Sequence, residues 1–454
     1  MPLRQIPGTE IEYYLISYDE DGRERGEPGG AKLSESVKKA VGDPAGGITD
    51  VFFVSHGWKG DVGSAIEQYD KWVGEMGRSR SDMDTARGVR PGFKSLVVGL
   101  HWPSLPWGDE KIPDAEDGVL GADGDDTPSI DDEVEQFAAS IADTPTARDA
   151  LRTIIEASRR EEQADNSIPP DVMEAYETLY AESGLATGDL GAAPGTDHEP
   201  WNPEGIYQES LENGGAGTVR QPGLLGFGSK LREAVIGPVR QLSFWKMKDR
   251  ARKFGESGAH DLLRELQQVA KPGVRFHLMG HSFGCIVASA AVAGPPNKPA
   301  LSRPVHSLYL VQGALSLWSY CASIDEADGK PGYFRRIVDE HLVEGPIVTT
   351  RSSKDTAVGK LYPKGAQVAR QVVLGDDDLP KYGGIGSYGI QGLGAVAEDI
   401  RMEGANHRYQ FERGRVYNVE ASDVIKEGGG FSGAHSDIAH PEVAHVFWQA
   451  VLTP

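Results

Sequence analysis

Apolar runs of strand length alternate with amphipathic segments near the start of the chain. The run TDVFFVSHGW at residues 49–58 is β-branched and aromatic, and the segment SAIEQYDKWVGEM after it repeats apolar residues at helical spacing. The run EIEYYLISYDEDG precedes both as an early strand, and a further apolar run, KSLVVGLHWPS, follows them. Strands that are apolar throughout are typical of a parallel sheet covered by helices on both faces. The pattern therefore predicts an α/β fold.

The same alternation returns from about residue 240 onward. Helices are predicted in FWKMKDRARKFGESGAHDLLRELQQVA, in the small-residue segment 282–293, in GYFRRIVDEHL and in PEVAHVFWQAVL. Strands are predicted in GVRFHLM, VHSLYLVQGAL, GPIVTTRSSKD and GRVYNVEAS. Repeated strand–helix units predict a doubly wound, mostly parallel sheet, whose two parts are residues 1–104 and residues 240–454.

Residues 105–239 break this alternation. The segment 145–184 and the stretch SKLREAVIGPV have helical spacing, whereas the Gly- and Pro-rich stretch at 184–205 favours turns and poor order. We predict a large, partly helical insertion in the α/β domain. It serves either as a cap over a site or as a docking surface.

The net charge of −22 is concentrated in this insertion. Residues 101–200 contain 25 acidic and 5 basic residues, so this segment alone has a net charge of −20. An acidic surface repels phosphate groups, and nucleic acid is therefore not expected as a partner. The Asp-rich stretch at 114–137 lacks the ligand spacing of an EF-hand loop. We predict neither a metal site nor an organic cofactor.

The overall composition, with 39% hydrophobic residues, is typical of a globular protein. No apolar run reaches about 18 residues, so no membrane span is predicted, and the first residues lack the apolar core of a signal peptide. Cys285 and Cys321 are the only cysteines, which is too few for a disulfide framework or a cysteine zinc site. We expect two reduced thiols and a cytoplasmic location.

The pentapeptide GHSFG places Ser282 between the predicted strand GVRFHLM and the small-residue helix. A nucleophile elbow requires this context: a strand, a tight turn strained at the serine, and a helix directly after it. A side chain at Gly280 or Gly284 would clash across such a turn, and the helix N-terminus directs partial positive charge at the serine. We predict Ser282 as a nucleophile; the alternative is a buried structural serine.

A serine hydroxyl needs a base to activate it, and the base needs an orienting acid. In the order serine, acid, histidine, Asp355 follows an apolar strand, and His435 lies in a Gly-rich loop between the last strand and the last helix. We predict these two residues as acid and base. Other residues are candidates for the same two roles. Asp437 is expected to orient a nearby backbone turn and not the base. The rivals are Asp325 and Asp423 as acids, and His440 and His445 as bases.

The oxyanion of a tetrahedral intermediate needs two hydrogen-bond donors. One is the backbone N–H of Phe283, directly after the serine; the other is expected in the loop VSHGWKG after an early strand. In this loop Gly57 follows His56 and lets the backbone approach, so the N–H of Trp58 is the predicted second donor. The alternative for His-Gly-Trp is an ordinary turn after a strand.

The segments FFVSHGW, LVVGLHWPS, FHLMGHSFG, IVTTRSSKD and GAHSDI together resemble the α/β-hydrolase superfamily, in its esterase and lipase-like branch. The resemblance implies an α/β-hydrolase fold with a catalytic triad of Ser282, His435 and Asp355. Two departures stand out. The chain has no His-Gly-Gly-Gly loop, so its oxyanion loop has a single glycine, and its insertion precedes the nucleophile strand, whereas many relatives carry their cap later.

If the insertion covers the site, four tryptophans are candidates for an acyl pocket, although aromatic residues in α/β proteins more often belong to the core. These residues are Trp102, Trp107, Trp201 and Trp318. We expect a serine hydrolase that cleaves carboxylic esters of small molecules or lipids through an acyl-enzyme. Thioesters and amides remain open, because a triad does not choose the leaving group. The alternative of another class is a non-catalytic binding or regulatory module that docks through the acidic insertion.

Overall fold

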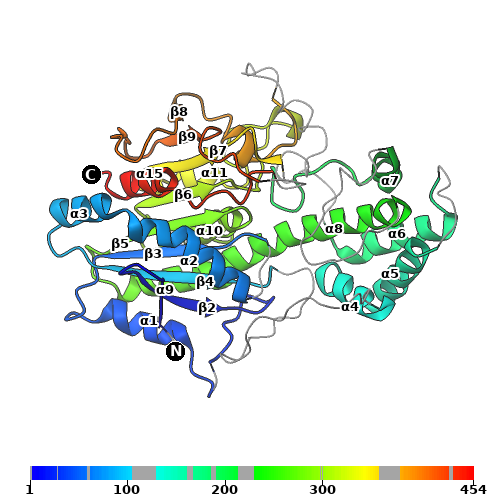
Figure 1. The fold of residues 1–454 in the computed structure, drawn as a ribbon, viewed down its shortest axis with the longest axis horizontal. Coiled ribbons are helices and arrows are strands. Elements are labelled where there is room, and N and C mark those ends of the chain that lie inside the picture. The colour runs from blue at the N-terminus through cyan, green and yellow to red at the C-terminus, as the bar shows by residue number, and fades with distance from the viewer. Residues whose placement is uncertain are drawn as a thin grey trace.

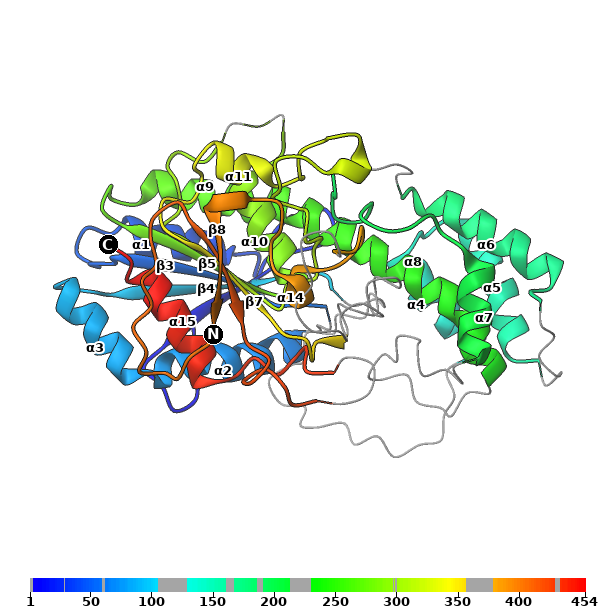
Figure 2. The ribbon, with the colours of Figure 1, turned by 90° about the horizontal axis from the view of Figure 1, so that it is seen from above.

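The computed structural model describes residues 3–27, 29–58, 62–104, 129–160, 167–185, 191–212, 230–296, 298, 300–356, 379–428 and 433–454. Within these residues the chain forms a core built on a sheet and a lobe of helices beside it (Figures 1 and 2). The long helix α8 (Lys230–Phe254) runs from the lobe into the core. The predicted Trp107 lies outside the described residues.

A nine-stranded sheet forms the centre of the described core. Its strands are β1 (Leu3–Gln5), β2 (Glu12–Ser17), β3 (Asp50–Ser55), β4 (Ser95–His101), β5 (Arg275–His281), β6 (Ser307–Val311), β7 (Ile347–Arg351), β8 (Ala397–Arg401) and β9 (Val416–Glu420). Their order across the sheet is β1-β2-β4-β3-β5-β6-β7-β9-β8. β1 is antiparallel to β2, and every other neighbouring pair is parallel. The prediction of an α/β fold with a mostly parallel sheet is confirmed.

Helices cover both faces of this sheet (Figure 2). One face is covered by α2 (Val62–Arg78), α3 (Arg80–Val89) and α15 (Pro441–Val451), the other by α1 (Leu33–Gly42), α9 (His260–Val269) and α10 (Gly284–Ala293). Side chains of β3 alternate between the two cores, with Val51 and Phe53 in one and Phe52 and Val54 in the other. All of β3 is buried, as expected for a central parallel strand.

The helices of the lobe pack along α8 (Figure 1). They are α4 (Ile130–Ser140), α5 (Pro145–Ser158), α6 (Pro170–Ser183) and α7 (Pro203–Glu212). Local sequence fixes where they begin. Thr144 caps α5 by accepting a hydrogen bond from the N–H of Ala147 at 3.1 Å, and Pro145 occupies the first helical turn. Ser129 and Asp132 form a reciprocal capping box at the start of α4.

Helix α8 belongs to both parts of the molecule, and the boundary predicted between residues 239 and 240 falls inside it. The helix continues through a π-helical turn, η1 (Gly255–Ala259), directly into α9. A β-carbon built on Gly255 would come 2.5 Å from the Ala290 β-carbon of α10. The absence of a side chain at Gly255 therefore allows this turn to lie directly on α10, the helix that follows Ser282.

The turn-rich stretch for which poor order was expected contains an anchored segment. Asp197 forms a salt bridge with Lys248 of α8, and each side chain is only 1% exposed. The Gly191 carbonyl accepts a hydrogen bond from the N–H of Tyr333 at 2.6 Å. Residues 191–197 therefore connect the lobe helix α8 to the loop before the short helix α11 (Arg335–Asp339).

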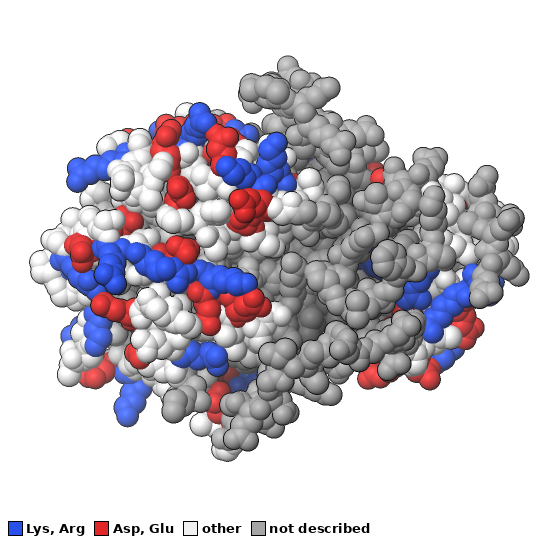
Figure 3. Space-filling model, in the orientation of Figure 1, with Lys and Arg blue, Asp and Glu red and all other residues white. Residues whose placement is uncertain are grey.

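Two edge strands were not predicted, and both lie at the ends of the sheet order. β1 has three residues, and β8 has the sequence AEDIR with no fully buried side chain. Short helical turns also lie between the strands in the second half of the chain. They are η2 (Asp325–Ala327), α14 (Ile385–Tyr388) and η4 (Gly394–Val396). Acidic and basic side chains are mixed over the core on the face shown in Figure 3, unlike the acidic bias of the insertion sequence.

Candidate active site

Ser282 stands on a strained turn between β5 and α10. Its φ angle is +56°, a left-handed conformation that residues with side chains rarely adopt. A β-carbon on Gly280 would collide with the carbonyl of Gly284, and one on Gly284 would collide with the carbonyl of Ser55 in β3. The two glycines therefore allow the turn to close on itself and on β3, which places Ser282 at the carboxyl end of β5.

Ser282, His435 and Asp355 are joined by two hydrogen bonds. The Ser282 hydroxyl donates to His435 Nε2 at 2.7 Å, and His435 Nδ1–H donates to Asp355 Oδ2 at 2.7 Å. Asp355 follows β7, and His435 lies in the loop between β9 and α15. All three residues are buried. In this arrangement the imidazole can accept the serine proton while the carboxylate fixes its tautomer.

Of the two rival acids, Asp423 has another partner in the structure. Asp423 pairs with Arg401 near the edge strand β8, and Asp325 lies in the turn η2. Asp437 accepts hydrogen bonds from the backbone N–H groups of Lys426 and Glu427, so it orients a backbone turn.

The two rival histidines also face other carboxylates. His440 bonds to Asp437 at 2.7 Å. His445 bonds to Asp82 of α3 at 2.9 Å, far along the chain from the candidate triad. The triad geometry therefore selects His435 among the three histidines near the end of the chain.

His281, the buried residue directly before Ser282, holds the loop that carries His435. The sequence analysis did not identify this residue. Gln68 of α2 donates a hydrogen bond to His281 Nδ1 at 2.6 Å, and His281 Nε2 donates to the His435 carbonyl at 2.9 Å. The acid and base loops also pair directly, because the N–H of Ala434 donates to the carbonyl of Lys354 at 3.0 Å. These contacts fix the backbone on both sides of the base.

The loop after β3 lies against the serine turn. A β-carbon on Gly57 would come 2.7 Å from the Ser282 β-carbon. The Trp58 ring stacks on Phe283, with ring centroids 5.7 Å apart. Neither the backbone N–H of Trp58 nor that of Phe283 donates a hydrogen bond to another described residue. These two N–H groups are therefore candidates for the donors that an oxyanion site requires.

His56 shapes this loop without carrying charge. Its Nδ1–H donates to the Gly57 carbonyl at 2.8 Å, and its Nε2 accepts from His101 at 3.1 Å. Burial, followed by the nearby His101, lowers the pKa of His56 to about 3. Trp102 donates from Nε1 to the His56 carbonyl at 3.2 Å and stacks on its ring. The neutral histidine therefore holds the backbone of the glycine loop in place.

The tryptophans predicted to line an acyl pocket lie in different parts of the structure. Trp102 is fully buried beneath the loop, so its ring is a core residue and not part of an open wall. Trp318 is partly buried and donates to the carbonyl of Lys381 at 3.1 Å. Trp201 stacks on Tyr180 in the lobe, with centroids 5.1 Å apart. Sequence reasoning missed Phe244 of α8, which packs against both Trp58 and Phe283.

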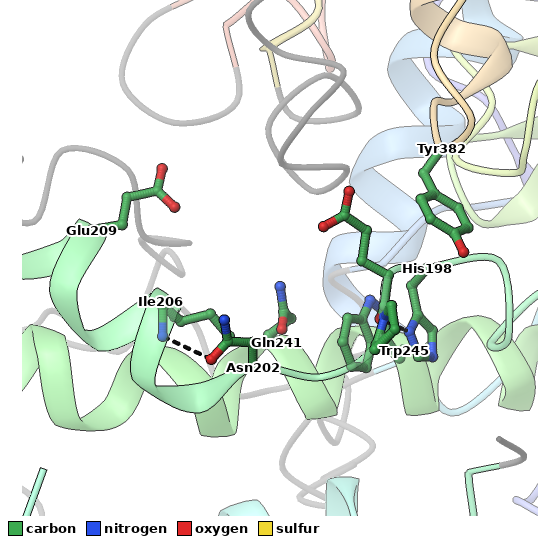
Figure 4. Close-up of a pocket in the computed structure, with 10 residues that line it drawn as sticks. His198, Asn202, Ile206, Glu209, Gln241, Trp245 and Tyr382 are labelled. Carbon is green, nitrogen blue, oxygen red and sulfur yellow. Dashed lines mark hydrogen bonds between the residues drawn. The ribbon is translucent and has the colours of Figure 1, made fainter.

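A pocket of about 200 Å³ lies beside α7 and α8 (Figure 4). Its walls are apolar and aromatic, with amide and carboxylate groups among them. It is lined by His198, Glu199, Pro200, Asn202, Gly205, Ile206, Glu209, Gln241, Trp245 and Tyr382. Tyr382 belongs to the segment that runs into α14, and α14 packs on β7, the strand before Asp355. None of the lining residues belongs to the candidate triad.

Comparisons with known proteins assign no family: no family model matches the chain, and no curated protein or solved structure matches at a significant level. Among the described residues, no group of three or more His, Cys, Asp or Glu side chains could hold a metal ion. The same part of the chain contains no helix that is long and apolar enough to cross a membrane. The geometry around Ser282 therefore carries the functional assignment.

Proposed function

We propose that this protein is a serine hydrolase of the α/β-hydrolase superfamily that cleaves carboxylic esters. The observation that carries the proposal is the unbroken chain of hydrogen bonds from Ser282 through His435 to Asp355, on a serine held at φ +56°. A structural serine has no need of this strained backbone or of a base and an acid in line. The mostly parallel sheet, with the three residues on loops after β5, β7 and β9, supports the superfamily assignment.

The mechanism follows from the positions of the groups. Ser282 Oγ attacks the ester carbonyl carbon while its proton moves to His435 Nε2, and the N–H groups of Phe283 and Trp58 stabilise the oxyanion. The intermediate collapses to an acyl-enzyme, and the departing alkoxide takes the proton from His435. Water then attacks the acyl carbon with His435 again as the base, which releases the carboxylic acid and restores the serine.

A fluorophosphonate probe tests the proposal directly, because it labels only a serine that has been activated as a nucleophile. We expect labelling of Ser282 in the native protein and none after heat denaturation. A series of p-nitrophenyl esters of increasing acyl length then measures ester hydrolysis and chain preference. Matched thioesters and anilides show whether the leaving group is restricted to alcohols. No labelling and no ester turnover would instead favour a binding module on this fold.

A further inference from the structure

Gln312 occupies a second strained position beside the candidate nucleophile. It is the first residue after β6 and has a φ angle of +47°, although it is not glycine. Its side chain is fully buried. The preceding residue, Val311, accepts a hydrogen bond from the N–H of Ser282 at 3.1 Å. Strained turns therefore follow two neighbouring strands at the same end of the sheet, one carrying the serine and the other carrying Gln312.

The backbone of Gln312 is fixed to the strand that leads to the acid. Its N–H donates to Thr350 Oγ1 in β7 at 3.0 Å. Asp355 follows that strand, and its N–H donates to the carbonyl of Ser352 at 3.1 Å. The backbone of Gln312 is therefore bonded to the strand that leads directly to Asp355.

The Gln312 amide reaches the acid itself. With the amide oriented to match its neighbours, the side-chain nitrogen donates to Asp355 Oδ2 at 3.1 Å and to the Gly386 carbonyl at 2.7 Å. Oδ2 is also the oxygen that accepts the His435 Nδ1–H. One carboxylate oxygen thus receives donors from both the base and Gln312.

Gly386 of α14 completes the enclosure of this carboxylate. A β-carbon on Gly386 would come 3.0 Å from Asp355 Oδ2 and 2.9 Å from the carbonyl carbon of Gln312. The Gly386 N–H donates to the Gly313 carbonyl at 2.9 Å. The segment that contains α14 is therefore pinned to the Gln312 turn, and it closes one side of the carboxylate.

We propose that Gln312 is a positioning residue that holds the Asp355 carboxylate in the orientation that receives the His435 Nδ1–H. This role rests on the proposed hydrolase function for its effect on rate. A buried amide without a positioning role could form all its hydrogen bonds with backbone groups. Gln312 donates to the Gly386 carbonyl and in addition directs its second N–H at a carboxylate oxygen, and hydrogen bonds to carboxylates are stronger than those between neutral groups. Its left-handed backbone places that donor where an extended conformation would not.

Two variants and one control test the role. Gln312→Leu removes the donor and keeps the bulk of the side chain. Gln312→Gly removes the donor and relieves the left-handed backbone, so it is the second variant to test if the Leu variant, which keeps the strain, does not fold. His341→Gly relieves the same kind of strain at an exposed residue with φ +51°, and it serves as the matched control.

Each variant is measured by ester kinetics, thermal unfolding and proton NMR of the low-field imidazole N–H of His435, assigned by its loss in His435→Ala. We expect both Gln312 variants to lower kcat about tenfold or more with little change in KM, as befits a lost hydrogen bond to a charged group. Their low-field proton shifts or broadens, while His341→Gly behaves like the native protein in both measurements.

Folded Gln312 variants with native kcat and a native low-field proton would overturn the proposal. A rise in KM without a fall in kcat would also overturn it, because substrate binding would then be the affected step. If the native protein hydrolyses no ester, the hydrolase function fails, and the low-field proton alone decides whether Gln312 positions Asp355. The two ideas therefore fail separately.

Discussion

Gly57 lies so close to Ser282 that a β-carbon built on Gly57 would come 2.7 Å from the β-carbon of the serine. We expect Gly57→Ala to push the oxyanion loop away from Ser282 and to lower kcat/KM about a hundredfold, the scale of losing one oxyanion donor. Ester kinetics check this. Gly273→Ala is the control, because nothing lies within 4 Å of a β-carbon there. Equal activity of the two variants would show that the loop after β3 has no part in catalysis.

Ser282→Ala should abolish fluorophosphonate labelling and ester turnover while thermal unfolding stays close to that of the native protein. The change removes only the hydroxyl, and loss of a triad nucleophile costs on the order of a million-fold in rate. Ser353→Ala, at an exposed serine just before the acid, should label normally. Labelling that persisted in Ser282→Ala would place the nucleophile elsewhere.

His435→Ala should be as damaging as loss of the serine, and Asp355→Asn should lower kcat about ten-thousandfold through loss of the correct tautomer. Matched changes at the rival acids, Asp325→Asn and Asp423→Asn, should leave kcat unaltered because Asp423 pairs with Arg401 at the sheet edge and Asp325 lies in η2. A loss of activity in either rival variant, with Asp355→Asn active, would reverse the assignment of the acid.

His445 should make stability depend on pH. Its Nδ1 bonds to Asp82 at 2.9 Å and its Nε2 to the His407 carbonyl at 2.6 Å, so both ring nitrogens act as donors. Burial alone would lower the pKa of His445, but the Asp82 carboxylate and the His407 carbonyl outweigh it and raise the pKa above its ordinary 6.5.

Because the folded-state pKa is raised, the stabilisation is fully present below pH of about 6.5 and is lost as pH rises through the folded-state pKa. We expect the difference in Tm between the native protein and His445→Gln to be largest in acid and to shrink on the alkaline side. The measurement is thermal unfolding of both proteins at a series of pH values from below 6.5 to above the folded-state pKa of His445. A difference in Tm that grows with pH would contradict a charged His445.

The serine turn could be predicted because its requirements are local. Gly280 and Gly284 flank Ser282 in the sequence, and the apolar strand before them and the small-residue helix after them are visible in the pattern of residues. The proposed acid and base followed from their order along the chain, since each lies in a loop after an apolar strand. Their mutual hydrogen bonds are visible only in the structure.

The supporting residues could not be predicted because they are polar residues with no spacing signal. Gln312 and His281 act through contacts with loops that are distant in sequence, and either could equally have been exposed. Edge strand β8 was missed because its residues AEDIR face solvent and show no apolar alternation. Helix α8 was divided at residue 239, directly after Pro238, because a proline inside a helix usually marks a break, although here the backbone does not break.

The pairing of β3 with β5 has a consequence for how the protein reaches this fold. β3 ends at Ser55 and β5 begins at Arg275, so the whole lobe is synthesised between two strands that lie side by side. Joining them requires closing a long loop, and such non-local pairing slows folding. Helices α4–α8 contact one another locally, so their early assembly shortens the loop that remains to be closed. We expect Lys248→Met, which removes the charge that pairs with the buried Asp197, to slow refolding in stopped-flow fluorescence, whereas Lys253→Met, at an exposed lysine of the same helix, does not. A lobe that contains none of the proposed triad would then control how quickly the triad forms.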